Sequence, residues 1–140
     1  MTDQDNAAYA ALVLRLAAGI TFVAHGLTKV LIFTIPGTVG FFESVGFPGV
    51  FAYLAILAEL GGGIALILGV AVRLVALLQI PVLLGAVWVH MDAGWMFANE
   101  GGGWEFPAFW AAVQVAIVLL GRGAYAVRLP AIDTALGKYA

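Results

Sequence analysis

Residues 50–91, VFAYLAILAELGGGIALILGVAVRLVALLQIPVLLGAVWVHM, decide the fold, because they contain two long apolar runs that only a short break near Gly69 separates. Glu59 and Arg73 are the only acidic or strongly basic residues in this stretch. About 20 apolar residues suffice for a helix to cross the bilayer core. In lipid every backbone amide needs a partner within its own segment, so both runs are predicted to be transmembrane helices and antiparallel neighbours.

The rest of the chain has the same apolar character. Of its 140 residues, 64% are hydrophobic and only 10% are charged, and the mean hydropathy is +1.06. Soluble domains carry about 25% charged residues. We therefore predict an all-α membrane protein, a bundle of four antiparallel transmembrane helices at about 9–33, 50–68, 73–91 and 106–120. These form one domain over residues 1–140. The opening MTDQDNAAYA lacks the basic start of a cleaved signal peptide, so we expect the first apolar segment to remain.

The distribution of charge predicts the orientation of these spans. One side of the predicted bundle carries Arg73, Arg122, Arg128 and Lys138. The loops after the first and third spans carry no Lys or Arg and hold Glu43, Asp92, Glu100 and Glu105. Because basic residues stay on the cytoplasmic side, both termini are predicted to be cytoplasmic, in the cytoplasmic (inner) membrane of a bacterium. Membrane lipids are then the first expected partners.

The first external loop contains a predicted short helix, within GTVGFFESVGFPG (37–49). Phe41, Phe42 and Val45 share one helical face. Gly46 offers a left-handed stop and Pro48 prevents continuation. An apolar face on a short helix beside two spans is typical of a helix that lies on the membrane surface.

Composition also excludes several kinds of chemistry. The chain has no cysteine, so it has no disulfide, no thiolate nucleophile and no cysteine-held iron–sulfur or haem group. Any redox chemistry needs a borrowed cofactor and a partner protein, and we do not expect an independent catalyst. The net charge of −2, without a basic patch, makes nucleic acid an unexpected partner.

Polar residues inside the spans are the candidates for function, because a charge at the bilayer centre costs about 2.5–3.5 kcal/mol. Counting 1.5 Å of rise per residue along spans of alternating direction places five of them in the outer half of the bundle. They are His25, Lys29, Glu59, His90 and Glu105. Two histidines and two carboxylates at one depth suit ligand binding or proton handling.

Structural roles remain open beside the functional ones. Arg15 can reach upward to Glu59, and the two are predicted to form a structural ion pair. Lys29 can snorkel to the interface, and each histidine can serve as an interhelical hydrogen bonder. Gln79 and Gln114 are predicted to join helices. No close-spaced motif such as HExxH accompanies the histidines, so no metal site is predicted.

The chain resembles the DoxX family of small four-helix membrane proteins. The resemblance rests on RLAAGITFVAHGLTKV, on the GFF and GFP pair, on AELGGG and on WEFPAFW. The family pattern falls on Arg15, His25, Gly26, Lys29, Glu59, Gly62, Arg73 and Glu105. The family takes its name from a membrane subunit of a thiosulfate:quinone oxidoreductase. The resemblance therefore implies a four-helix membrane domain associated with redox complexes.

The leading hypothesis is a membrane subunit of a quinone-linked complex, with a quinone or similar lipophilic ligand in the outer half of the bundle. His25 or His90 would hydrogen-bond a quinone carbonyl, and Glu59 and Glu105 would exchange protons. Electrons would come from another subunit. The rival hypothesis is a structural or assembly subunit whose polar cluster only specifies packing. A small transporter or proton path is the third hypothesis.

Overall fold

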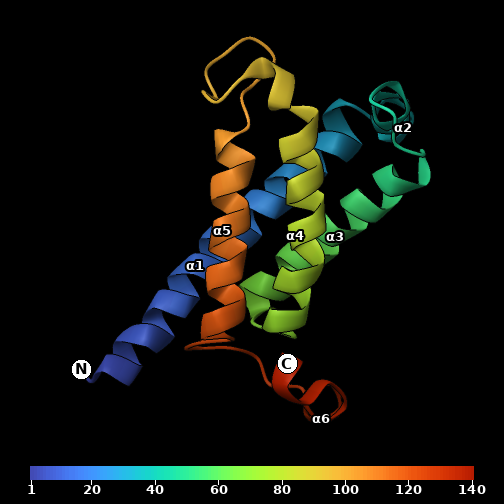
Figure 1. Cartoon of the computed structure of the whole chain (residues 1–140). Helices are drawn as coiled ribbons and strands as arrows, with labels where there is room; N and C mark the ends of the chain where they lie inside the picture. Colours follow the sequence, from blue (N-terminus) through green and yellow to red (C-terminus); the bar gives the residue numbers. More distant parts are fainter.

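Four long helices form the body of the protein, and the computed structural model describes all residues 1–140. The long helices are α1 (Asp3–Leu27), α3 (Val50–Leu68), α4 (Val72–Val89) and α5 (Glu105–Leu120) (Figure 1). The shorter elements are η1 (Thr28–Ile32), α2 (Ile35–Ser44), η2 (Met91–Ala93), α6 (Pro130–Leu136) and η3 (Gly137–Tyr139). There is no strand, which confirms the all-α prediction, and α3 has the predicted bounds of the second span.

α1 is longer at its start than hydropathy predicts. It begins at Asp3 because Thr2 and Asp5 form a capping box: the Asp5 amide donates to the Thr2 hydroxyl and the Thr2 amide donates to the Asp5 carboxylate. At the other end η1, a π-helical turn, continues the helix to Ile32. Such wider turns are rare and are frequently found at functional sites.

α1 and α3 pack closely because glycines face each other at their crossing. A Cβ atom at Gly19 would lie 2.7 Å from the Gly63 carbonyl oxygen, which leaves no room for a side chain. About two turns further along α1, a Cβ at Gly26 would lie 2.7 Å from the Leu60 side chain and 3.2 Å from Glu59 Cβ. Small residues let helix backbones approach in this way. Glu59 is therefore level with Gly26 and beside Lys29.

The connection between α3 and α4 is as short as predicted. Gly69 and Ala71 both have positive φ angles, 79° and 48°. The amides of Gly69 and Val70 donate to the Ala65 carbonyl at 2.8 and 2.9 Å, so they satisfy the end of α3. α4 then lies beside α5 (Figure 1), and Gln114 donates to the side-chain oxygen of Gln79 at 3.2 Å between them. The expectation that these glutamines join helices is confirmed.

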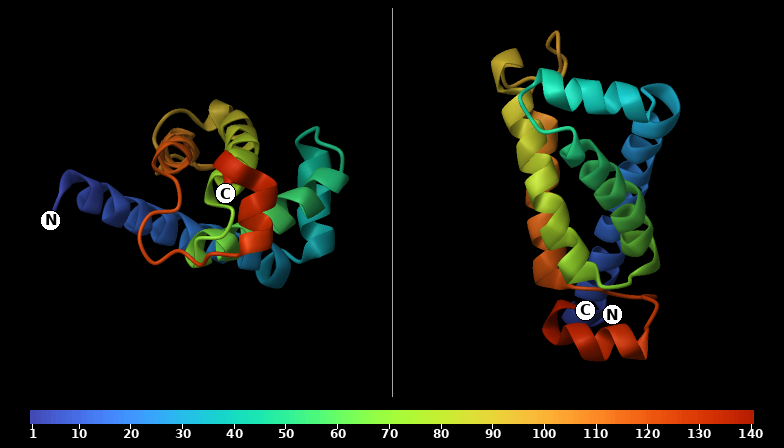
Figure 2. Two further views of the ribbon diagram at one scale, coloured as in Figure 1. Left: turned by 90° about the horizontal axis from the view of Figure 1, so that it is seen from below. Right: turned by 90° about the vertical axis from the view of Figure 1, so that its right-hand side faces the viewer.

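The predicted short helix in the first loop exists as α2. Pro36 stands in its first turn, and Gly46, with φ 90°, follows its end. The buried Thr38 hydroxyl donates to the Lys29 carbonyl at 2.9 Å, which fastens α2 to η1. Figure 2 (right) shows α2 lying across one end of the space between α3 and α4.

Three helical segments are long and apolar enough to cross a membrane: α1 with η1, α3 and α4. α5 is also apolar, but its 16 residues span about 24 Å against a bilayer core of about 30 Å. The chain is thus a multi-pass membrane protein in contact with lipid.

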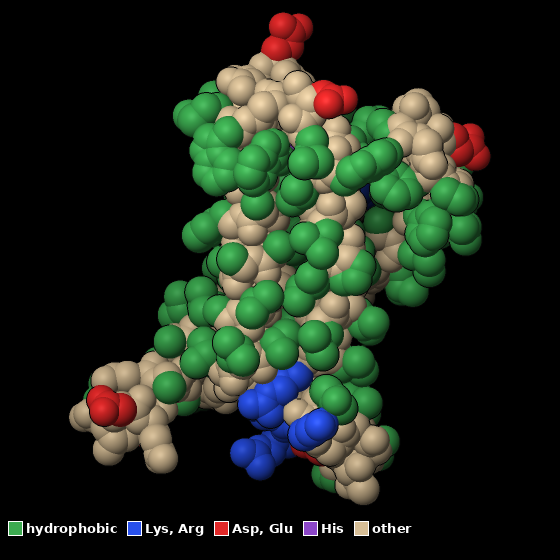
Figure 3. All heavy atoms as spheres, in the orientation of Figure 1, with side chains coloured by type: hydrophobic (Ala, Val, Ile, Leu, Met, Phe, Trp, Pro, Cys, Tyr) green, Lys and Arg blue, Asp and Glu red, His purple; other side chains and the backbone are tan.

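The C-terminal segment runs beneath the long helices and ends in α6 (Figures 1 and 2). The Ala124 amide donates to the Ala8 carbonyl at 3.0 Å, and the Val127 amide donates to Leu68 at 2.9 Å. Arg122 donates two hydrogen bonds to the Asp133 carboxylate, at 3.0 and 2.8 Å. Lys and Arg side chains gather at this end of the molecule, and acidic side chains stand at the opposite end and at the N-terminus (Figure 3).

Candidate functional site

A large cavity of about 800 Å³ lies between α2, α3 and α4. Its walls are mainly alkyl and phenyl groups, including Phe41, Phe42, Phe47 and Phe51. The side chains predicted to rest on the membrane surface, Phe41, Phe42 and Val45, are among these lining groups. The sequence pattern found an apolar helical face, but only the position of α2 over α3 and α4 shows that the face lines a cavity.

The polar lining of the cavity consists of Lys29, Glu59, Gln79 and His90. Three of these, all except Gln79, were predicted as site residues. They come from η1, α3 and the end of α4, three separate elements that the fold brings to one space. Mostly apolar walls with a few polar groups are typical of sites for small lipophilic molecules.

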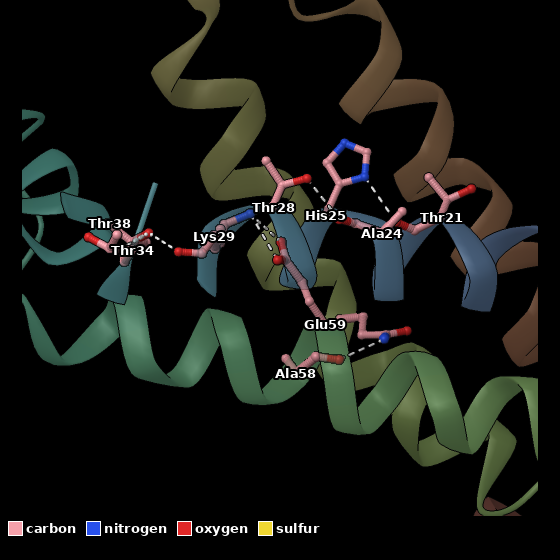
Figure 4. Close-up of polar contacts among 10 residues, drawn as sticks. Thr21, Ala24, His25, Thr28, Lys29, Thr34, Thr38, Ala58 and Glu59 are labelled. Carbon is pink, nitrogen blue, oxygen red and sulfur yellow. Dashed lines mark hydrogen bonds and ion pairs between the residues drawn. The ribbon is translucent and has the colours of Figure 1, made fainter. Parts of the chain in front are cut away.

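Lys29 and Glu59 form an ion pair at the cavity wall (Figure 4). The Lys29 Nζ atom donates to Glu59 Oε1 at 2.9 Å and lies 2.8 Å from Oε2. Glu59 is buried, with 6% of its surface exposed, and the Lys29 side chain is 20% exposed. The lysine is thus held inside the protein and does not simply snorkel to the interface.

The predicted ion pair between Arg15 and Glu59 is wrong. Arg15 is almost completely buried and donates only to backbone carbonyls. Its acceptors are Leu66 (2.9 Å), Ile67 (2.6 Å), Arg122 (2.9 Å) and Ala124 (2.7 Å). Leu66 and Ile67 belong to the last turn of α3, where unpaired carbonyls and the helix dipole favour a cation. Arg15 therefore joins α1 to the end of α3 and to the C-terminal segment, and it does not line the cavity.

The two histidines lie in different surroundings. His90 lines the cavity, and its Nδ1 is 3.0 Å from the Gly101 carbonyl oxygen. His25 does not line the cavity; it is exposed, and its ring lies 5.1 Å from Trp110 and 6.3 Å from Phe106. Its Nδ1 is 2.9 Å from the Thr21 carbonyl (Figure 4). Equal depth along two helices did not reveal which face of α1 the histidine occupies.

Glu105 also lies outside the cavity. Its Oε1 accepts a hydrogen bond from the Phe97 amide at 3.1 Å, so it fixes the loop before α5. The backbone pairs Gly103–Met96 and Trp104–Gly94 close the same loop. Glu105 borders a separate hollow with Trp95, Phe97 and Phe109. Of the five residues predicted to lie together, only Lys29, Glu59 and His90 line the same cavity.

Gln79 is the one polar residue of the cavity lining that was not predicted as a site residue. Its side-chain amide donates to the Ala58 carbonyl at 2.9 Å, next to Glu59 in the chain, and it accepts from Gln114. A Cβ at Gly62 would lie 2.6 Å from its Nε2 atom, so AELGGG supplies both the carboxylate and the space for this amide. No three His, Cys, Asp or Glu side chains are grouped to hold a metal ion.

Comparison with known proteins gives two matches. The DoxX family model matches residues 10–92, more than half of the chain. A Bacillus subtilis protein named "Putative oxidoreductase CatD" is 41% identical over 76 residues, which cover 54% of this chain and 55% of that protein. The chain thus spans about half the length of the curated relative that it matches. No solved structure matches the chain.

Proposed function

The chain belongs to the DoxX family, and we propose that it is a subunit of a membrane redox complex that binds a quinone, or a similar lipophilic ring compound, in the cavity between α2, α3 and α4. The observation that carries this proposal is an apolar cavity of about 800 Å³ with a buried ion pair in its wall. Ligand pockets in proteins measure about 300–1,000 Å³ and combine apolar walls with few polar groups. The name of the B. subtilis relative supports a redox role.

The residues present fit a quinone. The phenyl groups of Phe41, Phe47 and Phe51 suit an aromatic ring and an isoprenoid chain. Lys29 keeps ammonium hydrogens beyond those that meet Glu59, and it can donate to a ring oxygen. Glu59 and His90 can hold or release a proton. A bound quinone supplies two-electron, two-proton redox chemistry, and a partner subunit supplies the electrons because the chain has no cysteine to carry a redox centre.

The arrangement in the membrane is part of the proposal. α1, α3, α4 and α5 cross the bilayer as an antiparallel bundle, with α2 at the outer interface. The chain path in Figure 1 and the apolar exposed surface in Figure 3 support this arrangement. The base, which carries Arg73, Arg122, Arg128 and Lys138, faces the cytoplasm of a bacterial cell, as the positive-inside rule requires.

A second candidate function is a structural subunit that holds a larger complex together. The observation in its favour is that several buried polar groups do nothing but join segments of this chain. Arg15 binds four carbonyls, and Gln114 binds Gln79. Interhelical polar contacts of this kind fix packing without a ligand.

Mass spectrometry of lipophilic molecules that co-purify with the gently extracted protein separates the two functions. A quinone at about one per chain is expected for the wild-type protein. Gly85 borders the cavity, and a Cβ there would meet no atom within 4 Å, so Gly85→Phe places a ring in open cavity space. This variant should fold and lose the quinone.

Gly40→Phe is the matched control, because a Cβ at Gly40 on α2 also meets no atom within 4 Å and this residue does not line the cavity. It should keep the quinone. If the wild-type protein carries no quinone, or if Gly85→Phe retains as much as Gly40→Phe, the structural subunit becomes the better conclusion.

A further inference from the structure

The side chain of His90 is held in one tautomer. Its Nδ1 lies 3.0 Å from the Gly101 carbonyl oxygen, and a carbonyl can only accept a hydrogen bond. Nδ1 of the neutral ring must therefore carry the hydrogen. Nε2 is then left with a lone pair and has no partner within the protein. In the cavity wall, neutral His90 is a hydrogen-bond acceptor.

A second acceptor stands in the same wall. Glu59 Oε2 is buried and has no hydrogen bond of acceptable angle, although Lys29 Nζ lies 2.8 Å away. The better-directed hydrogen bond of Lys29 goes to Oε1. A carboxylate can only accept hydrogen bonds, so Glu59, like neutral His90, offers no donor to a ligand in the cavity.

Glu59 and His90 come from different elements, α3 and the end of α4, and both residues line the cavity. A quinone carries carbonyl oxygens, which only accept hydrogen bonds and so cannot pair with the Nε2 lone pair of neutral His90. A quinol carries hydroxyl groups, which donate. The polar lining is thus complementary to the reduced form of the ligand.

We infer that the cavity selects a quinol, or another lipophilic phenol, over the corresponding quinone, with His90 Nε2 as the determinant of that choice. The inference rests on the proposed function and assigns His90 a role opposite to donation to a quinone carbonyl. Lys29 remains available to either form. Since His90 is half-buried and at a helix end, it can be changed without opening the core.

The test is anaerobic calorimetric titration of the purified protein with decylubiquinone and, in the same buffer, with its quinol. The wild-type protein should bind the quinol more tightly. His90→Leu removes the acceptor and should weaken quinol binding about fivefold to tenfold, as one hydrogen bond lost, with quinone binding unchanged. His90→Lys replaces the acceptor by a donor and should reverse the preference.

His25→Leu is the matched control, because His25 makes the same Nδ1 contact with a carbonyl but does not line the cavity. It should preserve the quinol preference. Equal affinity for the two forms, or equal losses for both in His90→Leu, overturns this inference and leaves the quinone site intact. If the wild-type protein binds neither form, the inference and the proposed function fail together.

Discussion

Gly19 of α1 and Gly63 of α3 meet backbone to backbone, and each excludes a side chain from the other. A Cβ at Gly19 would lie 2.7 Å from the Gly63 carbonyl oxygen, and a Cβ at Gly63 would lie 2.8 Å from the Gly19 carbonyl oxygen. This crossing sets the level of α3 along α1. It therefore sets which residues of α1 stand beside Glu59.

Gly19→Ala should destabilise the protein by about 1–3 kcal/mol, because the added methyl group would push apart the backbones of α1 and α3, which are already in contact at this point. Thermal unfolding in detergent, followed by tryptophan fluorescence, measures the loss. Gly85→Ala is the control, since its Cβ would meet no atom within 4 Å, and it should be neutral or stabilising. Equal stability of the two variants would contradict the close crossing.

Lys29 and Glu59 should be coupled in a double-mutant cycle. Lys29→Met or Glu59→Gln alone leaves one charge in the wall of the cavity and should cost about 3 kcal/mol of unfolding free energy. The double variant should recover part of that loss. Arg15→Gln combined with Glu59→Gln should show additive losses instead, because Arg15 binds carbonyls at the base. Coupling in the second cycle and additivity in the first would reverse the assignment.

Arg15 should control the attachment of the C-terminal segment, because it donates to the Arg122 and Ala124 carbonyls. In Arg15→Leu the segment loses these bonds, and trypsin should cleave after Arg128 several times faster than in the wild-type protein. Limited proteolysis followed by mass spectrometry measures the rate. Thr21→Val, which removes a hydroxyl elsewhere on α1, is the control and should be cleaved at the wild-type rate.

Attachment of α6 should weaken in acid. The hydrogen bonds from Arg122 hold the pKa of Asp133 below its ordinary value of 3.8. A carboxyl group with a depressed pKa stabilises the folded state above its ordinary pKa, and this contribution is lost as the pH falls through the lower, folded value. A nitroxide attached through Thr134→Cys should therefore gain mobility only below about pH 4.

The same label in an Asp133→Asn background should be mobile at every pH, because the amide cannot be ionised. The chain has no other cysteine to take up the label. If the nitroxide spectrum of the labelled protein that keeps Asp133 does not change between neutral pH and the acid range, the ion pair between Arg122 and Asp133 does not hold α6 in place.

The orientation in the membrane has a direct test. Ser44, Asn99 and Thr134 are all exposed. Ser44 is the last residue of α2 and Asn99 lies in the loop before α5, and both of these segments lie at the end of the molecule opposite α6 (Figure 1). Ser44→Cys and Asn99→Cys should react with a membrane-impermeant thiol reagent added to intact cells. Thr134→Cys should react only after the cells are lysed. Labelling of the Thr134 variant in intact cells would place the basic end outside.

The sequence was sufficient for the helices but not for their relative heights. The apolar runs predicted α3 to the residue, and Gly46 and Pro48 placed the end of α2. Glu59 was assigned to Arg15 because depth was counted from the ends of straight, upright spans. The real α1 starts at Asp3 and crosses α3 at Gly19, so Glu59 stands beside Lys29.

Contacts between side chains and backbone carbonyls explain the remaining differences at the site. Opposite charges can be matched in a sequence, but the carbonyls of Leu66, Ile67 and Gly101 carry no sequence signal of their own. The cavity was likewise hidden, because it arises where α2 lies across α3 and α4. His90 was found because a histidine in an apolar run is unusual, whereas its tautomer depends on a loop eleven residues later.

The carbonyl partners of Arg15 are made in a fixed order during synthesis of the chain. Leu66 and Ile67 emerge from the ribosome about fifty residues after Arg15, but Arg122 and Ala124 follow only after 107 and 109 residues. The guanidinium group must therefore enter the membrane, or wait at its surface, with no more than half of its final acceptors. Synthesis of Arg122 and Ala124 then supplies the other two carbonyl acceptors, so the packing of α1 is complete only after the segment that follows α5 has been made.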